Sequence, residues 1–370
     1  MIKMLLNPSN EQAISVYPAF PIPQSPKQAH TLSQQIAYLL SNAHHMLPEV
    51  EIILNTLYKN LPIILHSAFT NEEPIALLEV HKTLYTIYEV SLCHLLSPIC
   101  IHEHSPWLIA IRNEIENAWL NYELPHIQKQ LPSLSEAKHP QLLCDWFVEQ
   151  AHTESDIDKC LLSFFKNQAS IEQFNIFILS EATLNNRFCD ALALTQLHFS
   201  ATVKAEIVKA EIVHNMWDEC GHGVPEKSHA RQFQQMLNAL GLQQPTLPIW
   251  EDWRPYAGHN LYFCFGLNRK HYFKGIGSLG MPEIFDPNRN RSIVAGLERL
   301  YSDARIKCEY FYNHIEVDEI HGLGWLNNVI APIVEVQPEA GMELAIGGAL
   351  RMEAMRRYNE YLAVRLGLLK

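Results

Sequence analysis

Glycine is scarce in this chain, with 15 residues among 370. Segments that alternate apolar and polar residues between turn signals, as the strands of hairpins do, are also hard to find. Both deficits argue against a sandwich or a barrel of short strands. We therefore expect an all-α protein.

Concentrated positive charge is lacking as well. The formal net charge is −12, and lysine and arginine nowhere gather into the basic face that phosphate neutralisation requires. This balance argues against nucleic acid as a partner. A membrane partner is not expected either, because the short apolar run after Met1 soon meets Asn7 and Pro8 and forms neither a signal peptide nor a span.

Cysteine pairs with C-x-x-C spacing are missing too. The eight cysteines fall mainly within apolar stretches of helical character, so reduced, buried thiols explain them better than a disulfide framework does. This use of cysteine predicts a cytoplasmic protein.

The chain does have a large apolar fraction, 48%, and a length that exceeds the usual single domain. Two domains are therefore expected. Five prolines within residues 1–28 predict an extended arm at the start. Apolar residues then recur at helical spacing from Trp107 to Trp119, behind the helix-start signals Ser105 and Pro106.

The stretch 131–140, which contains two prolines and two serines, is the best candidate boundary between the domains. We predict an N-terminal arm and helical subdomain over 1–139 and a second helical domain over 140–370.

The most informative motif is H-x-x-x-D-x-x-H, formed by His314, Asp318 and His321. On an α-helix, offsets of four and seven residues correspond to about 40° and −20° around the axis, so the three side chains share one narrow stripe. Imidazole and carboxylate together suit Fe, Mn or Zn better than Ca or Mg. Taken alone, the motif also fits a solvated helix face with incidental histidines.

Partners for this stripe must come from other segments. Glu219 and His229 are ten residues apart, and on a continuous helix they would point in directions about 80° apart. Gly221, Gly223 and Pro225 lie between them and predict a helix that breaks after Glu219 and restarts before His229.

A third segment contributes Glu283, an isolated carboxylate in small and apolar surroundings. Unpaired buried charge is expensive, so Glu283 needs a partner. Pro282 directly precedes it and predicts a kink of the helix at that point.

The combined pattern resembles the heme-oxygenase-like diiron oxidases and oxygenases, a family of α-helical proteins that bind two irons in place of heme. The resemblance covers about residues 140–370. It rests on the D-E-x-G-x-G run at 218–223, the G-x-L-G-x-x-E run at 277–283, the H-x-x-x-D-x-x-H helix, and six residues whose order and spacing fit the metal ligands of the family: Glu219, His229, Glu283, His314, Asp318 and His321.

This resemblance implies a heme-oxygenase-like helical bundle with two Fe ions as cofactors and O2 as cosubstrate. It implies that Glu219, His229 and His321 serve one iron, and that Glu283, His314 and Asp318 serve the other. The substrate would be a small metabolite, and the reaction would be N-oxygenation or C–C cleavage of an amine or amino acid, or decarboxylation of a fatty acid. An external electron donor and a homodimer stay open.

Two other classes of function also stay open. One is a non-catalytic helical protein that binds metal or a partner. The other is a heme-degrading or thiaminase-like enzyme of the same fold, for which Cys220 is the only cysteine in a suggestive position. Glu181 and Glu211 are further carboxylates near the predicted site, and for Glu211 a supporting contact is expected rather than direct ligation.

Overall fold

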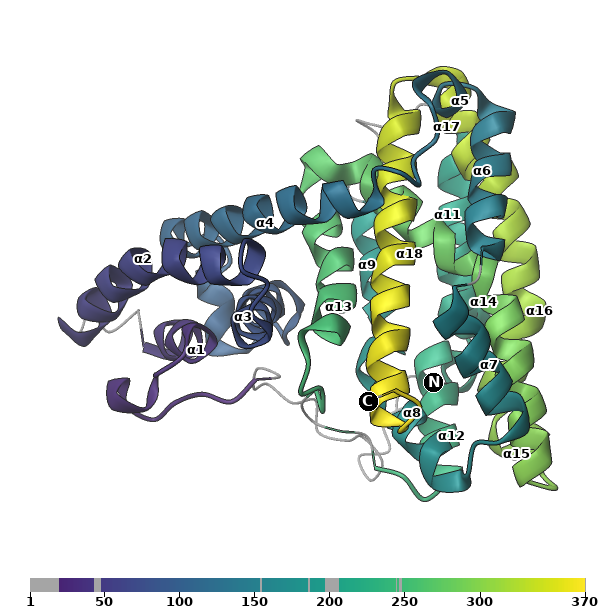
Figure 1. Cartoon of the computed structure of the whole chain (residues 1–370), viewed down its shortest axis with the longest axis horizontal. Coiled ribbons are helices and arrows are strands. Elements are labelled where there is room, and N and C mark those ends of the chain that lie inside the picture. The colour runs from purple at the N-terminus through teal and green to yellow at the C-terminus, as the bar shows by residue number, and fades with distance from the viewer. Residues whose placement is uncertain are drawn as a thin grey trace, which may run out of the picture. The chain divides into compact units, whose positions relative to one another are not determined.

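The computed structural model describes residues 20–42, 48–153, 155–185, 187–196, 206–243, 245 and 248–369. Every regular element in these ranges is a helix (Figure 1), which confirms the predicted all-α class. None of the described helices is both long and apolar enough to cross a membrane. The cytoplasmic location stays a prediction.

The described residues pack into two compact units, 1–119 and 120–370. Their border falls inside helix α4 (Pro106–Ile127). The boundary predicted at 139/140 stays a prediction of where an independently folding domain begins. In the stretch 131–140 the chain forms the short helix α5 (Leu134–Ala137), which a reciprocal capping box between Ser133 and Glu136 closes.

The first unit is formed by helices that bury leucine-rich faces against one another. Its elements are η1 (Pro26–Gln28), α1 (Leu32–Asn42), α2 (Pro48–Phe69), α3 (Pro74–Leu92), η3 (Pro98–His102) and the first part of α4. Leu108, Ile111, Ile115 and Trp119 of α4 are buried, so the helix predicted from their spacing is confirmed. Most of the predicted N-terminal arm, residues 1–19, lies outside the described residues.

The second unit is a larger bundle around the 29-residue helix α14 (Tyr272–Leu300), which packs against α7, α16 and α18 (Figure 1). Its other helices are α6 (Pro140–His152), α7 (Asp156–Asn167), α8 (Ile171–Asn185), α9 (Arg187–Thr195), α11 (Glu206–Glu219), α12 (His229–Ala239), α13 (Trp253–Gly266), α15 (Ala304–Lys307), α16 (Glu309–Gly324), α17 (Ala331–Val336) and α18 (Ala340–Arg365). Short 3₁₀ segments lie at 221–223, 225–227 and 269–271, and a π-helical segment, η8 (Trp325–Ile330), follows α16.

The helix break predicted after Glu219 is confirmed. Helix α11 ends at Glu219, two 3₁₀ turns follow, and α12 begins at His229. Gly221 adopts a φ of +69° and Gly223 a φ of +78°, which are left-handed conformations that only glycine adopts without strain. Helix α14 continues through Pro282, the site of the predicted kink, and through Pro287.

The approach of α16 to α14 is unusually close at Gly322. A Cβ atom on Gly322 would lie 2.8 Å from the carbonyl oxygen of Glu283. The lack of a side chain at this position therefore allows the α16 turn that carries His321 to lie directly against the α14 turn that carries Glu283.

Candidate metal centre

The H-x-x-x-D-x-x-H stripe of α16 faces the interior of the bundle. Asp318 is 5% exposed and His321 1% exposed, whereas Glu319 and Ile320 between them are exposed. His314 is half-buried, and its Nδ1 lies 2.7 Å from the carbonyl oxygen of Tyr310, one turn earlier. The alternative of a solvated helix face does not apply to these three residues.

The helix break brings Glu219 and His229 together. Nδ1 of His229 lies 2.9 Å from Oε2 of Glu219, and both side chains are nearly buried. The ring of His229 also lies 4.2 Å from the ring of His314, centroid to centroid. This contact joins the α11–α12 pair to the stripe on α16.

Glu283 joins the remaining residues from α14. Its Oε2 lies 3.2 Å from Nδ1 of His321, and its Oε1 accepts a hydrogen bond of 2.9 Å from the amide of Asn215. Ligand atoms of Glu283, Asp318 and His321 all lie within 4.8 Å of one another, a grouping that is able to hold a metal ion.

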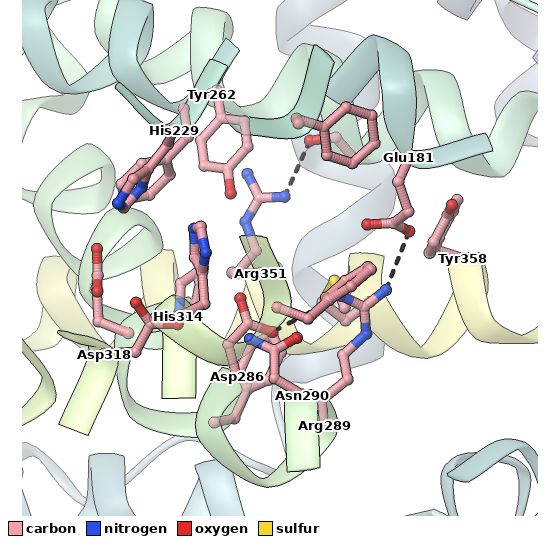
Figure 2. Close-up of a pocket in the computed structure, with 18 of the residues that line it drawn as sticks. Glu181, His229, Tyr262, Asp286, Arg289, Asn290, His314, Asp318, Arg351 and Tyr358 are labelled. Carbon is pink, nitrogen blue, oxygen red and sulfur yellow. Dashed lines mark hydrogen bonds and ion pairs between the residues drawn. The ribbon is translucent and has the colours of Figure 1, made fainter. Parts of the chain in front are cut away.

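All six sequence-predicted residues therefore come together, from the four helices α11, α12, α14 and α16. Five of them line one cavity of about 150 Å³, and the sixth, His321, contacts Glu283 at its wall. Figure 2 shows His229, His314 and Asp318 grouped at one end of this cavity. Their role as metal ligands, and their division between two irons, stay predictions.

Burial and crowded like charge perturb the titration of this set. Burial raises the pKa of Asp318 well above its usual range, and the charges of Glu283, Asp286 and Glu219 raise it further. Burial likewise lowers the pKa of His314 to about 3, and the neighbouring His229 adds to this effect.

His321 shifts in the opposite direction. Burial alone would lower its pKa, but the hydrogen bonds and charges of Glu283 and Asp218 raise it to about 9. Both shifts favour the protonated forms of Asp318 and His321 in the metal-free site, and metal binding would have to displace such protons because metal ligands bind in their deprotonated forms.

The chemistry of this donor set fits iron. Burial and the charges of Glu283, Asp286 and Glu219 disfavour the charged form of Asp318, and a cation placed beside it would reverse that effect. Imidazole nitrogens beside the carboxylates favour a transition metal over Ca or Mg.

Two supporting residues were not identified as such from the sequence. Nε2 of His321 lies 2.8 Å from Oδ2 of Asp218, the residue before Glu219, and the buried Asn215 holds Glu283. A metal-ligating histidine usually donates its second N–H to such a carboxylate, which fixes the orientation of the ring. The signal that was available is spacing, because Asn215 and Glu219 are four residues apart on α11.

The further carboxylates considered from the sequence occupy different places. Glu181 lines the cavity and pairs with Arg289 at 3.0 Å. Glu211 instead accepts a hydrogen bond of 2.8 Å from Asn328 on η8 and is not among the residues that line the cavity. Cys220 is exposed and does not line it either, and none of the described lining residues is a cysteine.

Comparison with known proteins relates part of the second unit to redox enzymes. Residues 176–356 match the model of a family described as iron-containing redox enzymes. Over 146 residues the chain is also 26% identical to a nitrosourea synthase from Streptomyces achromogenes subsp. streptozoticus. That alignment covers 39% of this chain and 29% of the synthase, so the chain spans less than a third of the length of the relative that it matches.

The family resemblance expected from the sequence is therefore confirmed. The comparisons support an oxidative enzyme of an iron-containing family with this fold.

The helix break provides a first test. In Gly221→Ala the new Cβ would lie 2.4 Å from backbone atoms of Lys227 and Ser228, whereas Gly241 has a similar φ of +70° and nothing within 4 Å of the position that a Cβ would take. Both variants should lose about 1 kcal/mol of unfolding free energy to backbone strain. Gly221→Ala should lose about 1–3 kcal/mol more because of the steric clash, as measured by urea unfolding of the metal-free protein. Equal losses of unfolding free energy in the two variants would show that the backbone around Gly221 accommodates a Cβ atom without a steric penalty.

The contact between Asp218 and His321 provides a second test. We expect Asp218→Asn to weaken Fe(II) binding about 10–100-fold, since His321 loses the carboxylate that orients it. The control is His222→Asn, because His222 is largely exposed and contacts the other carboxylate oxygen of Asp218 at 2.8 Å. Anaerobic titration in competition with a chelator measures both affinities. An unchanged affinity in Asp218→Asn would contradict this role.

Proposed function

We propose that this chain, whose residues 176–356 match the iron-containing redox enzymes, is an O2-dependent non-heme diiron oxidase or oxygenase of a small metabolite. One observation carries the proposal. Six ionisable side chains from four helices meet at one end of a cavity, and three of them are carboxylates.

The number of ligands supports two irons. Three imidazoles and three carboxylates exceed what one ion needs in a site that must also leave positions open for O2. Two Fe(II) ions in this site would supply electrons for the reduction of O2, which zinc, having no accessible redox change, would not.

The chain's own residues would orient the ligands and exclude water. Asp218 contacts His321, and Asn215 donates a hydrogen bond to Glu283, so each would fix the orientation of one predicted ligand. The ring of Tyr310 lies 4.0 Å from that of His314, and Phe233 packs edge-on against Tyr310 at 5.1 Å. This aromatic wall beside the histidines would limit the entry of water to the site.

The nitrosourea synthase guides the choice of reaction. A nitroso group contains an oxidised nitrogen, so within our proposal we favour oxygenation at nitrogen over decarboxylation of a fatty acid. The other classes have less support. Heme requires a much larger space than a cavity of about 150 Å³, and a thiaminase-like mechanism requires a cysteine in the cavity.

The first experiment counts the irons. Protein loaded with excess Fe(II) without air should bind close to two irons per chain, as measured by Mössbauer spectroscopy and metal analysis. A value that stays at zero or one in folded protein would argue for a different metal site and against the diiron proposal.

A second experiment removes one ligand. His321→Ala should retain the helical circular dichroism spectrum, lose at least one iron, and slow the O2-dependent oxidation of bound Fe(II) by about tenfold or more. His152→Ala, at an exposed histidine of α6, is the matched control and should behave as the unmodified protein does. If His321→Ala is oxidised at the same rate as the control, an oxygenase role for this site is wrong and a metal-binding role is favoured.

A further inference from the structure

The cavity holds a second charged group, which the predicted metal ligands do not include. Its members are Glu181, Asp286, Arg289 and Arg351. Figure 2 shows Arg351 and Asp286 between the ligand end, with His229 and His314, and the opposite end, where Glu181 faces Arg289. A molecule bound between Arg351 and Asp286 would therefore lie beside the metal site.

At the opposite end of the cavity, Arg289 and Glu181 form an ion pair with each other. Arg289 donates to Glu181 at 3.0 Å and lies over the ring of Phe177, with its guanidinium carbon 5.3 Å from the centroid. The other branch of its guanidinium comes no closer than 3.9 Å to Asp286. Arg289 is therefore occupied by Glu181 and only weakly compensates Asp286.

Arg351 and Asp286 are left with unused hydrogen-bonding capacity. Arg351 is 3% exposed, donates to the carbonyl oxygen of Gly258 at 3.0 Å and to Oγ of Ser278 at 3.3 Å, and lies 3.6 Å from the ring centroid of Tyr262. Its Nη2 has no hydrogen-bond partner, and neither does Oδ1 of Asp286, although both atoms are buried. Buried polar atoms without partners are costly, and a ligand that supplies the partners would remove this cost.

The two atoms without partners select the kind of ligand. Burial raises the pKa of the Asp286 carboxyl group to about 7, and a cationic group beside Oδ1 would stabilise its charged form. An anionic group would pair with Nη2 of Arg351 in the same way. One free donor and one free acceptor therefore match the carboxylate and the ammonium group of a zwitterion.

From these observations we infer that the cavity binds a small α-amino acid, with its carboxylate at Arg351 and its ammonium group at Asp286. The inference rests on the proposed function, and it names the substrate class of that same site. Phe188, Tyr262 and Phe285 line the cavity and would receive the side chain. A cavity of similar volume is known to hold benzene, so a small side chain fits best.

A long aliphatic tail fits less well. A neighbouring pocket of about 70 Å³ shares Phe285, Arg289 and Met355 with the cavity, so an aliphatic tail that occupies both would lie beside the ion-paired guanidinium group of Arg289. This arrangement disfavours a fatty acid.

The test compares three ligands that share one side chain and differ in their charged groups. Isothermal titration calorimetry against the twenty standard amino acids selects the one that binds most tightly, and its amine without the carboxylate and its acid without the amino group are then measured. We expect the amino acid to bind about tenfold or more tightly than either analogue, since each analogue leaves one charged group unpaired. If no amino acid binds, or if an analogue binds as tightly as its parent, the inference is wrong.

Two variants test which residue binds the carboxylate of the ligand and which binds its ammonium group. Asp286→Asn should weaken binding of the amino acid about tenfold and leave the acid analogue unchanged, while Arg351→Gln should weaken the amino acid and leave the amine analogue unchanged. Asp303→Asn, an exposed aspartate outside the cavity, is the control. Equal losses for all three ligands in both variants would indicate a general disturbance of the cavity and would overturn the assignment.

The measurements are made on metal-free and on Fe(II)-loaded protein. Amino acid binding to metal-free protein tests the subsite by itself. Failure to load two irons, with amino acid binding intact, would count against the diiron proposal and not against the subsite.

Discussion

The pairing of buried acidic side chains with histidines is the interaction on which the candidate site of the second unit depends. Glu219 lies against His229 and Glu283 lies against His321. Burial would raise the pKa of Glu219, but the charge of His229 lowers it. For Asp318, in contrast, burial raises the pKa and the neighbouring carboxylates raise it further. A buried carboxylate without a cationic partner is costly, so a cation beside Asp318 would stabilise its charged form.

Two backbone features make the crowding geometrically feasible. The left-handed turn at Gly221 lets the chain reverse between Glu219 and His229, so residues ten apart in sequence become direct neighbours. The absence of a side chain at Gly322 lets α16 lie against α14 beside Glu283. The six predicted ligands, which come from four helices, thus form a compact cluster because glycine occupies these two positions.

The parts of this site that sequence reasoning predicted are those that local geometry fixes. The stripe of His314, Asp318 and His321 follows from helical periodicity alone, and the break before His229 follows from glycine and proline. The contacts of Asn215 and Asp218 depend on how α11 packs against α14 and α16, which no local pattern encodes.

Asp286 and Arg351, in the middle of the cavity, were missed for a similar reason. Glu283 and Asp286 are three residues apart on α14 and share one face of that helix, and this was a usable signal. Arg351 comes from α18, however, and its position opposite that face is a property of the packed bundle. The fold class was predictable because it depends on composition and periodicity over the whole chain, which single contacts do not alter.

The two prolines inside α14 have a consequence for Glu283. Proline has no N–H to donate, so Pro282 and Pro287 leave the carbonyl groups of Ser278 and Glu283 without their usual partners in the helix. The turn between them is therefore held by fewer backbone hydrogen bonds than a helix without prolines would have. With fewer such bonds to break, a small shift of the backbone at Glu283 would cost less there, so its carboxylate would be able to adjust to a bound cation with little disturbance of the surrounding bundle.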